Sequence, residues 1–110
     1  MKVISLLNLK GGVGKTTSTH SIASGLNLKG KKVLVIDMDP QGTLTFFSKG
    51  DKKLNGDTRE ILFHEKTIIE ATTSGEEFDF IGSNIKLATS EILLNNGYNK
   101  EQKLKKAIDK

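Results

Sequence analysis

The stretch from residue 10 to residue 17, Lys-Gly-Gly-Val-Gly-Lys-Thr-Thr, constrains the fold more than any other part of the sequence. It follows an apolar segment at residues 3–9 and opens a run with helical spacing. Glycines remove side chains, so backbone N–H groups in such a loop can approach the oxygens of a phosphate group. The N-terminus of the following helix adds unpaired N–H groups and a favourable dipole. This order of segments predicts a phosphate-binding loop in an α/β fold.

Two side chains of this loop have the chemistry to hold a nucleotide. Lys15 carries a positive charge that can neutralise terminal phosphates, and the Thr16 hydroxyl is suited to Mg²⁺. The loop departs from the common spacing G-x-x-x-x-G-K-[ST], because Leu9 occupies the position of the first glycine and Lys10 opens the loop instead.

This double-lysine form resembles the deviant Walker A loop of the ParA/MinD-type ATPases, K-G-G-x-G-K-[ST]-[ST]. The resemblance implies that the whole loop binds ATP through Lys10, Gly11, Gly12, Val13, Gly14, Lys15, Thr16 and Thr17. It also implies that Lys10 is a signature lysine, which reaches the partner's phosphates in an ATP-bound homodimer and neutralises charge during phosphoryl transfer. The alternative is that Lys10 is a surface lysine in a cationic loop.

A second block, residues 31–42, predicts a buried strand that ends in two carboxylates. The apolar, mostly β-branched residues 33–36 are typical of a parallel strand covered on both faces. Asp37 and Asp39 follow where the strand reaches its carboxyl edge, and ligands of open α/β sheets bind at that edge. We therefore expect both aspartates near Lys15 and Thr16.

The resemblance assigns roles to these two aspartates. It places Asp37 and Asp39 beside Mg²⁺ and the attacking water, with Asp37 supporting the metal together with Thr16 and Asp39 orienting the water. Gln41 is expected to line the site. The alternative is that the two carboxylates only cap a turn at the end of the strand.

The expected fold is a P-loop NTPase-type parallel sheet with flanking helices, truncated to about three strands. The patterns predict strands at about residues 3–8, 32–37 and 78–81, and helices at 15–28, 58–64, 89–94 and 100–110. Residues 78–88 are similar to the next strand and turn of the family, with Gly82 where the family often has proline. Asp57 and Glu60 have the spacing of a capping box, and Gly30 is expected to end the first helix.

Two segments carry weaker signals. Residues 42–55 are polar and contain glycine, which predicts a loop or a frayed short helix. Leu44, Phe46 and Phe47 are expected to cover part of the core, and the alternative is that they form an exposed contact. Residues 67–72 are β-branched and ambiguous between a strand and a helix. The first helix is expected to bury Ile22, Ala23, Leu26 and Thr19 along one face.

Composition narrows the class of protein. The chain has 110 residues, 35% hydrophobic and 27% charged, enough for one small domain. It has no cysteine, which excludes disulfides and thiolate metal sites and argues against an iron–sulfur relative of the family. No apolar run is long enough to cross a bilayer and no secretory signal is apparent, so we expect a cytoplasmic protein with no membrane partner. The net charge of +4 is compatible with a nucleic-acid partner, but a solvated basic surface is the favoured interpretation.

The resemblance covers nearly all of this chain, whereas residues 1–110 cover only the N-terminal part of the family's domain. Family members continue into a further strand that carries the Walker B aspartate. The resemblance implies a Mg²⁺-dependent ATPase of chromosome or plasmid partitioning, with a ParB-like centromere-binding partner and non-specific DNA, hence an association with the nucleoid. The segment that begins at Asp39 favours the ParA branch over the MinD branch. The alternative is a nucleotide-binding or dimerising fragment that does not hydrolyse ATP.

Overall fold

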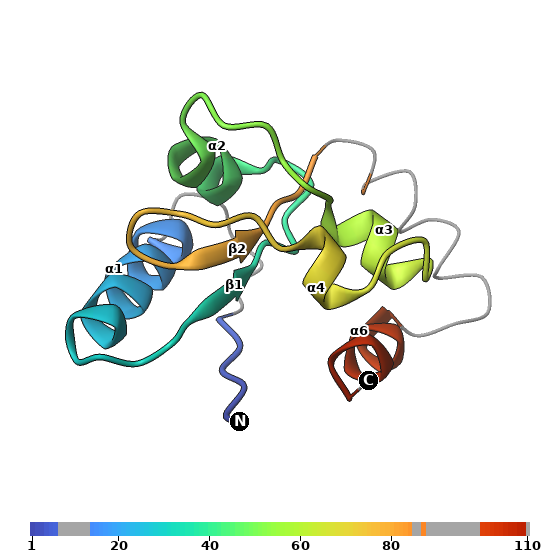
Figure 1. Ribbon diagram of the computed structural model, residues 1–110, viewed down its shortest axis with the longest axis horizontal. Helices are drawn as coiled ribbons and strands as arrows, with labels where there is room; N and C mark the ends of the chain where they lie inside the picture. The colour runs from blue at the N-terminus through green and yellow to red at the C-terminus, as the bar shows by residue number, and fades with distance from the viewer. Residues whose placement is uncertain (7–13, 85–86, 88–99, 110) are drawn as a thin grey trace.

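The computed structural model describes residues 1–6, 14–84, 87 and 100–109, in which helices flank a short parallel sheet (Figure 1). The elements follow in the order α1 (Lys15–Leu28), β1 (Leu34–Ile36), α2 (Thr43–Lys49), α3 (Thr58–Leu62), α4 (Ile68–Ala71), β2 (Asp79–Ile81) and α6 (Lys100–Asp109). Helices lie on both sides of the two strands in the view of Figure 1. The predicted α/β class with a parallel sheet is confirmed.

Strands β1 and β2 pair in parallel, with Val35 opposite Phe80 at the centre of the register. The ladder extends past β1, because the N–H of Asp37 donates to the Ile81 carbonyl at 3.0 Å. Val35 and Phe80 are buried in one core cluster with Ala23 of α1. The two strands therefore end side by side, and their carboxyl ends form one edge as expected of a parallel pair.

The prediction of a strand at residues 3–8 is wrong for residues 3–6. These residues have no regular secondary structure, and Val3 and Ile4 are 65% and 67% exposed. A strand is stabilised by hydrogen bonds to a neighbour, and residues 3–6 take no part in the two-stranded sheet of β1 and β2. Residues 7 and 8 lie outside the described part of the chain.

Helix α1 has the predicted bounds, and Gly30 follows it with a φ of 77°, as expected of a glycine just past a helix end. Ala23 is buried as predicted, whereas Ile22 is 43% exposed. Ala23 belongs to the core cluster that contains Val35 and Phe78. The adjacent Ile22 points in a different direction around the helix axis and therefore faces solvent.

Helix α2 agrees with the second of the two alternatives predicted for residues 42–55, a short helix. Leu44 is buried as expected, but Phe46 and Phe47 are 70% and 69% exposed and pack edge to face against each other. The helical turn explains the difference, because a helix that buries Leu44 and Thr45 directs the following two side chains outward. The expectation that both phenylalanines cover the core is therefore wrong.

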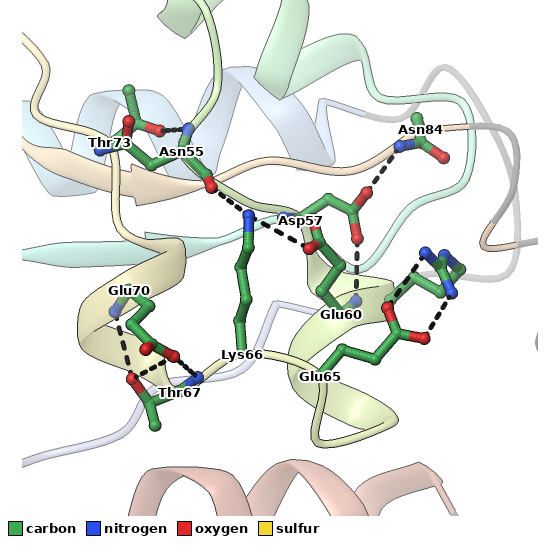
Figure 2. Close-up of polar contacts among 10 residues, drawn as sticks. Asn55, Asp57, Glu60, Glu65, Lys66, Thr67, Glu70, Thr73 and Asn84 are labelled. Carbon is green, nitrogen blue, oxygen red and sulfur yellow. Dashed lines mark hydrogen bonds and ion pairs between the residues drawn. The ribbon is translucent and has the colours of Figure 1, made fainter.

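Two capping boxes define the middle of the chain. The predicted pair Asp57 and Glu60 is confirmed, since each side chain bonds the other's backbone N–H at the start of α3 (Figure 2). Thr67 and Glu70 make the same reciprocal bonds at α4, which settles the ambiguous segment at 67–72 as a helix. Helix α3 ends at Leu62, two residues before the predicted end at residue 64.

The Glu70 carboxylate gives α4 a predictable response to acid. The Thr67 N–H donates to it at 2.8 Å, and this bond with that of the Thr67 hydroxyl holds the pKa of Glu70 below its ordinary value. The folded pKa is the lower one, so the bonds stabilise the fold above the unfolded pKa and are lost as pH falls through the folded pKa. We expect the free energy of unfolding of Glu70→Gln to fall less steeply at acid pH than that of the wild type. The control is Glu76→Gln, at an exposed position, which is expected to keep the wild-type dependence on pH. Equal acid limbs for the wild type and Glu70→Gln would contradict this.

Helix α6 agrees with the predicted helix up to Asp109, and its Leu104 packs against two core clusters, one around Ile61 and one around Leu62. The helix predicted at residues 89–94 lies outside the described residues. Within the part of the chain that the structure describes, no helix combines the length and apolar character needed to cross a bilayer.

Candidate phosphate-binding site

The two sequence motifs meet at the edge formed by the carboxyl ends of the strands. The Lys15 Nζ atom, at the start of α1, lies 3.8 Å from the Asp39 Oδ2 atom, just after β1. Both side chains are about one-third exposed, at 34% and 33%. The expectation that the second block reaches the loop lysine is confirmed for Asp39, and solvent retains access to this pair.

The N-terminus of α1 has the features of an anion site. Gly14 occupies the N-cap with a φ of 82°, which favours glycine, and no side chain caps the helix. The first turn, which includes Thr16 and Thr17, contains no acidic residue. Within the described residues no capping side chain accepts from its N–H groups, and Lys15 lies in the same turn.

The first half of the loop lies outside the described residues. This applies to Lys10, Gly11, Gly12 and Val13. Their predicted contacts with phosphate, and the predicted role of Lys10 across a dimer, stay predictions.

Asp39 lies in a tight turn that directs its carboxylate. Its Oδ1 atom accepts the N–H of Gln41 at 3.0 Å, and its carbonyl accepts the N–H of Gly42 at 2.9 Å. The Oδ2 atom is left to face Lys15. An oxygen in this position is available to a cation or a water molecule beside the loop, which agrees with the role predicted for Asp39.

Asp37 has a different environment, because it is only 6% exposed and both of its carboxylate oxygens accept hydrogen bonds. Oδ1 accepts the Asp39 N–H at 3.0 Å, while Oδ2 accepts the Thr45 N–H at 3.1 Å and the Thr45 hydroxyl at 2.6 Å. In the described residues, Asp37 therefore caps α2 and fixes the turn that follows β1. These contacts match the capping alternative, and a direct bond from Asp37 to Mg²⁺ stays a prediction.

Three buried hydroxyl residues complete this edge, and the sequence interpretation missed them. The Thr45 hydroxyl accepts the Ser83 N–H at 2.8 Å. The Thr58 hydroxyl oxygen lies 2.5 Å from the Asp37 carbonyl oxygen and 3.1 Å from the Gly82 carbonyl oxygen, and its single hydrogen points between these two acceptors. Among the described residues, the Ser83 Oγ atom is buried without a hydrogen-bond partner. Such contacts between distant segments leave no signal in the spacing, because the Thr45 and Thr58 hydroxyls meet their partners only after the strands pair.

Gly82 is required where β2 meets α2 and the loop before α3. A Cβ atom at this position would lie 2.7 Å from the Thr45 Cγ2 atom and 2.8 Å from a Leu54 methyl group. We expect Gly82→Ala to lower the free energy of unfolding by about 1–3 kcal/mol through overpacking. Gly25→Ala is the matched control, since nothing lies within 4 Å of that Cβ and alanine favours a helix. Urea unfolding measures both; an unaffected Gly82→Ala chain would contradict the close packing.

Comparisons with known proteins identify relatives of this chain. The model of the AAA domain family matches residues 1–110. The sporulation initiation inhibitor protein Soj of Bacillus subtilis is 37% identical over 112 residues, covering 98% of this chain and 44% of that protein. The chromosome partitioning protein ParA of Caulobacter vibrioides is 30% identical over 112 residues, covering 99% of this chain and 42% of that protein. This chain spans less than half of the length of these curated relatives.

A solved structure extends the likeness to three dimensions. The cobyrinic acid a,c-diamide synthase of Mycobacterium smegmatis, with a bound ATP analogue and magnesium, superimposes with a TM-score of 0.84 at 36% identity. The match covers 94% of this chain and 43% of that one. The fold at the phosphate-binding edge is therefore shared with a protein whose structure holds a nucleotide and a metal ion.

Proposed function

Because the chain belongs to the ParA/MinD-type family of P-loop ATPases, we propose that it binds ATP with Mg²⁺ at the carboxyl edge of its sheet. The observation that carries the proposal is the 3.8 Å approach of Lys15 to Asp39, which brings the phosphate-binding loop and the strand-end carboxylate together. The uncapped N-terminus of α1 supports it, because a polyphosphate needs several N–H donors at close range.

The residues present suit a nucleotide and its metal. In this proposal Lys15 neutralises the terminal phosphates, and the first-turn N–H groups, which include those of Thr16 and Thr17, hold their oxygens. The Thr16 hydroxyl and the carboxylate side of the site, Asp37 and Asp39, supply the oxygen ligands that Mg²⁺ prefers. The bound metal would neutralise charge that develops on the transferred phosphoryl group.

We further propose that hydrolysis uses a water molecule held by Asp39. Phosphoryl transfer needs positioning and charge neutralisation more than covalent chemistry. The Oδ2 atom of the one-third-exposed Asp39 side chain faces Lys15, so a water held there would stand next to the phosphates that Lys15 binds. Lys10 is proposed to supply a second positive charge across an ATP-bound homodimer.

The proposed cellular role is partitioning of a chromosome or plasmid. It is supported by the relative named as a chromosome partitioning protein, which matches 99% of this chain. A ParB-like centromere-binding partner and non-specific DNA belong to the same proposal. The proposed nucleotide site does not depend on the proposed role in partitioning, because the similar synthase structure also holds an ATP analogue and magnesium.

The test is a titration of the chain with a fluorescent ATP analogue, with Mg²⁺ and again with a chelator, followed by phosphate release and sedimentation. Saturable binding that Mg²⁺ tightens, with phosphate release and an ATP-dependent dimer, is the expected result. Binding without release would favour the alternative, a nucleotide-binding module that does not hydrolyse ATP. A folded chain that binds no nucleotide would overturn the proposal.

A further inference from the structure

We propose that Thr45 is a positioning residue for the nucleotide site, which holds the Asp37 carboxylate in the orientation that places Asp39 opposite Lys15. The inference rests on the proposed function and deepens it. It gives a role to a buried residue that lies outside both recognised motifs.

The Thr45 hydroxyl joins the ends of both strands. It donates to the Asp37 Oδ2 atom at 2.6 Å, after β1, and accepts the Ser83 N–H at 2.8 Å, after β2. Thr45 is 4% exposed, and Asp37 and Ser83 are similarly buried. Because water has little access to this point, each of these bonds would be costly to lose without replacement.

The contacts continue from Asp37 to the proposed site. The second carboxylate oxygen of Asp37 accepts the Asp39 N–H at 3.0 Å, and the Asp39 carboxylate lies 3.8 Å from Lys15. The Asp37 carboxylate is therefore held on one side by Thr45 and holds Asp39 on the other. If the Asp37 carboxylate rotates about its Cβ–Cγ bond, the hydrogen bond from the Asp39 N–H to Oδ1 is broken.

Helix capping and strand pairing do not account for the Thr45 hydroxyl. The cap of α2 is satisfied by the Thr45 N–H, which donates to Asp37 at 3.1 Å. The strands are joined past β1 by the bond from the Asp37 N–H to the Ile81 carbonyl. The hydroxyl adds a second bond to the same Asp37 oxygen, so its removal leaves Oδ2 with the Thr45 N–H as its one donor among the described residues.

Three substitutions separate this role from general stability. Thr45→Val removes the hydroxyl at nearly constant shape, and Thr45→Ser retains it. Thr73→Val is the matched control, because Thr73 is also 4% exposed and its hydroxyl accepts a single bond, from the Asn55 N–H, away from the site (Figure 2). Thr45→Cys keeps a weak donor and decides the question if Thr45→Val does not fold.

The first measurement is the affinity of each chain for a fluorescent ATP analogue, with Mg²⁺ and with a chelator. We expect Thr45→Val to reduce the gain in affinity from Mg²⁺ by about tenfold while the metal-free affinity stays unchanged, since Lys15 and α1 are untouched. Thr45→Ser is expected to keep the gain, and Thr45→Cys to lose part of it. Thr73→Val is expected to lower the melting temperature and keep the gain.

The second measurement is hydrogen exchange at the Asp39 and Ser83 amides without nucleotide. We expect faster exchange at both in Thr45→Val and wild-type rates in Thr73→Val. A Thr45→Val chain with wild-type exchange at Asp39, or with an undiminished gain from Mg²⁺, would overturn the inference, as would an equal loss of that gain in Thr73→Val. If the folded wild type binds no nucleotide, the proposed function fails, and exchange at Asp39 alone decides whether Thr45 positions that residue.

Discussion

Lys15→Ala is expected to lower the affinity of the chain for ATP by about a hundredfold, because a charge-assisted contact to phosphate contributes roughly 1.5–3 kcal/mol. Lys15 is the loop lysine that the described residues place beside the carboxyl edge, 3.8 Å from Asp39. Its substitution removes the positive charge and leaves a carboxylate facing the phosphates. The attraction between Lys15 and the phosphates is lost, while the repulsion between Asp39 and the phosphates remains.

The matched control for this prediction is Lys29→Ala. Its substitution changes the net charge by the same amount as Lys15→Ala. Lys29 is exposed and lies at the opposite end of α1, about 20 Å from the loop for a helix of this length. Both variants are expected to melt near the wild-type temperature, because a partly exposed ion pair contributes at most about 1 kcal/mol. Titration with fluorescent ATP and Mg²⁺ measures the difference. An undiminished affinity in Lys15→Ala would refute its contact with phosphate, and an equal loss in Lys29→Ala would assign the effect to overall charge.

The features that the sequence predicted correctly depend on local patterns. The bounds of α1 follow from helical spacing between a loop glycine and Gly30. The cap of α3 follows from two residues, Asp57 and Glu60, three positions apart. The approach of Asp39 to Lys15 is a longer-range prediction that the structure confirms. Asp39 follows β1 at the carboxyl edge as expected, whereas the strand expected before the loop of Lys15 is not formed at residues 3–6.

The predictions that failed depend on which surface is covered. Val3 and Ile4 have the composition of a buried strand, yet the described residues provide them with no paired strand. Phe46 and Phe47 are hydrophobic, but the orientation of α2 is set by Leu44 and Thr45, so both rings face outward. Hydrophobic character alone does not determine burial, because exposed apolar side chains are common on folded proteins.

The network around Asp37 lay beyond prediction for another reason. The contacts of Thr45 with Asp37 and with Ser83 join residues 8 and 38 positions apart. No periodicity relates these positions, and the residue type alone does not distinguish a buried threonine from an exposed one. The sequence placed Asp37 at the site, whereas its partners became visible only with the pairing of β1 and β2.

The second large effect is expected at Asp39, where Asp39→Asn should reduce ATP turnover by about a hundredfold or more, as is typical when a group that positions the nucleophile is removed. Asparagine retains an oxygen that can accept the Gln41 N–H, which Asp39 accepts at 3.0 Å, so the turn after β1 is preserved. What is lost is the negative charge of the oxygen that faces Lys15 and, in our proposal, holds the attacking water. ATP binding without Mg²⁺ should be retained or strengthened, because the substitution removes a negative charge close to the phosphates.

The split between binding and turnover separates this prediction from the one at Lys15. Phosphate release and ATP titration are to be measured on the same preparations of wild type, Asp39→Asn and Asp51→Asn, the last being an exposed aspartate just beyond α2. Turnover in Asp39→Asn at the wild-type rate would refute the assignment of Asp39 to the attacking water. If Asp39→Asn loses both ATP binding and turnover, Asp39 is instead a residue of the binding site. Its charge would then be needed to hold Lys15 in place or to retain Mg²⁺. Because Asp39 is only one-third exposed and opposes the loop lysine, its charge is expected to act on the water in the catalytic step, after the nucleotide is already bound.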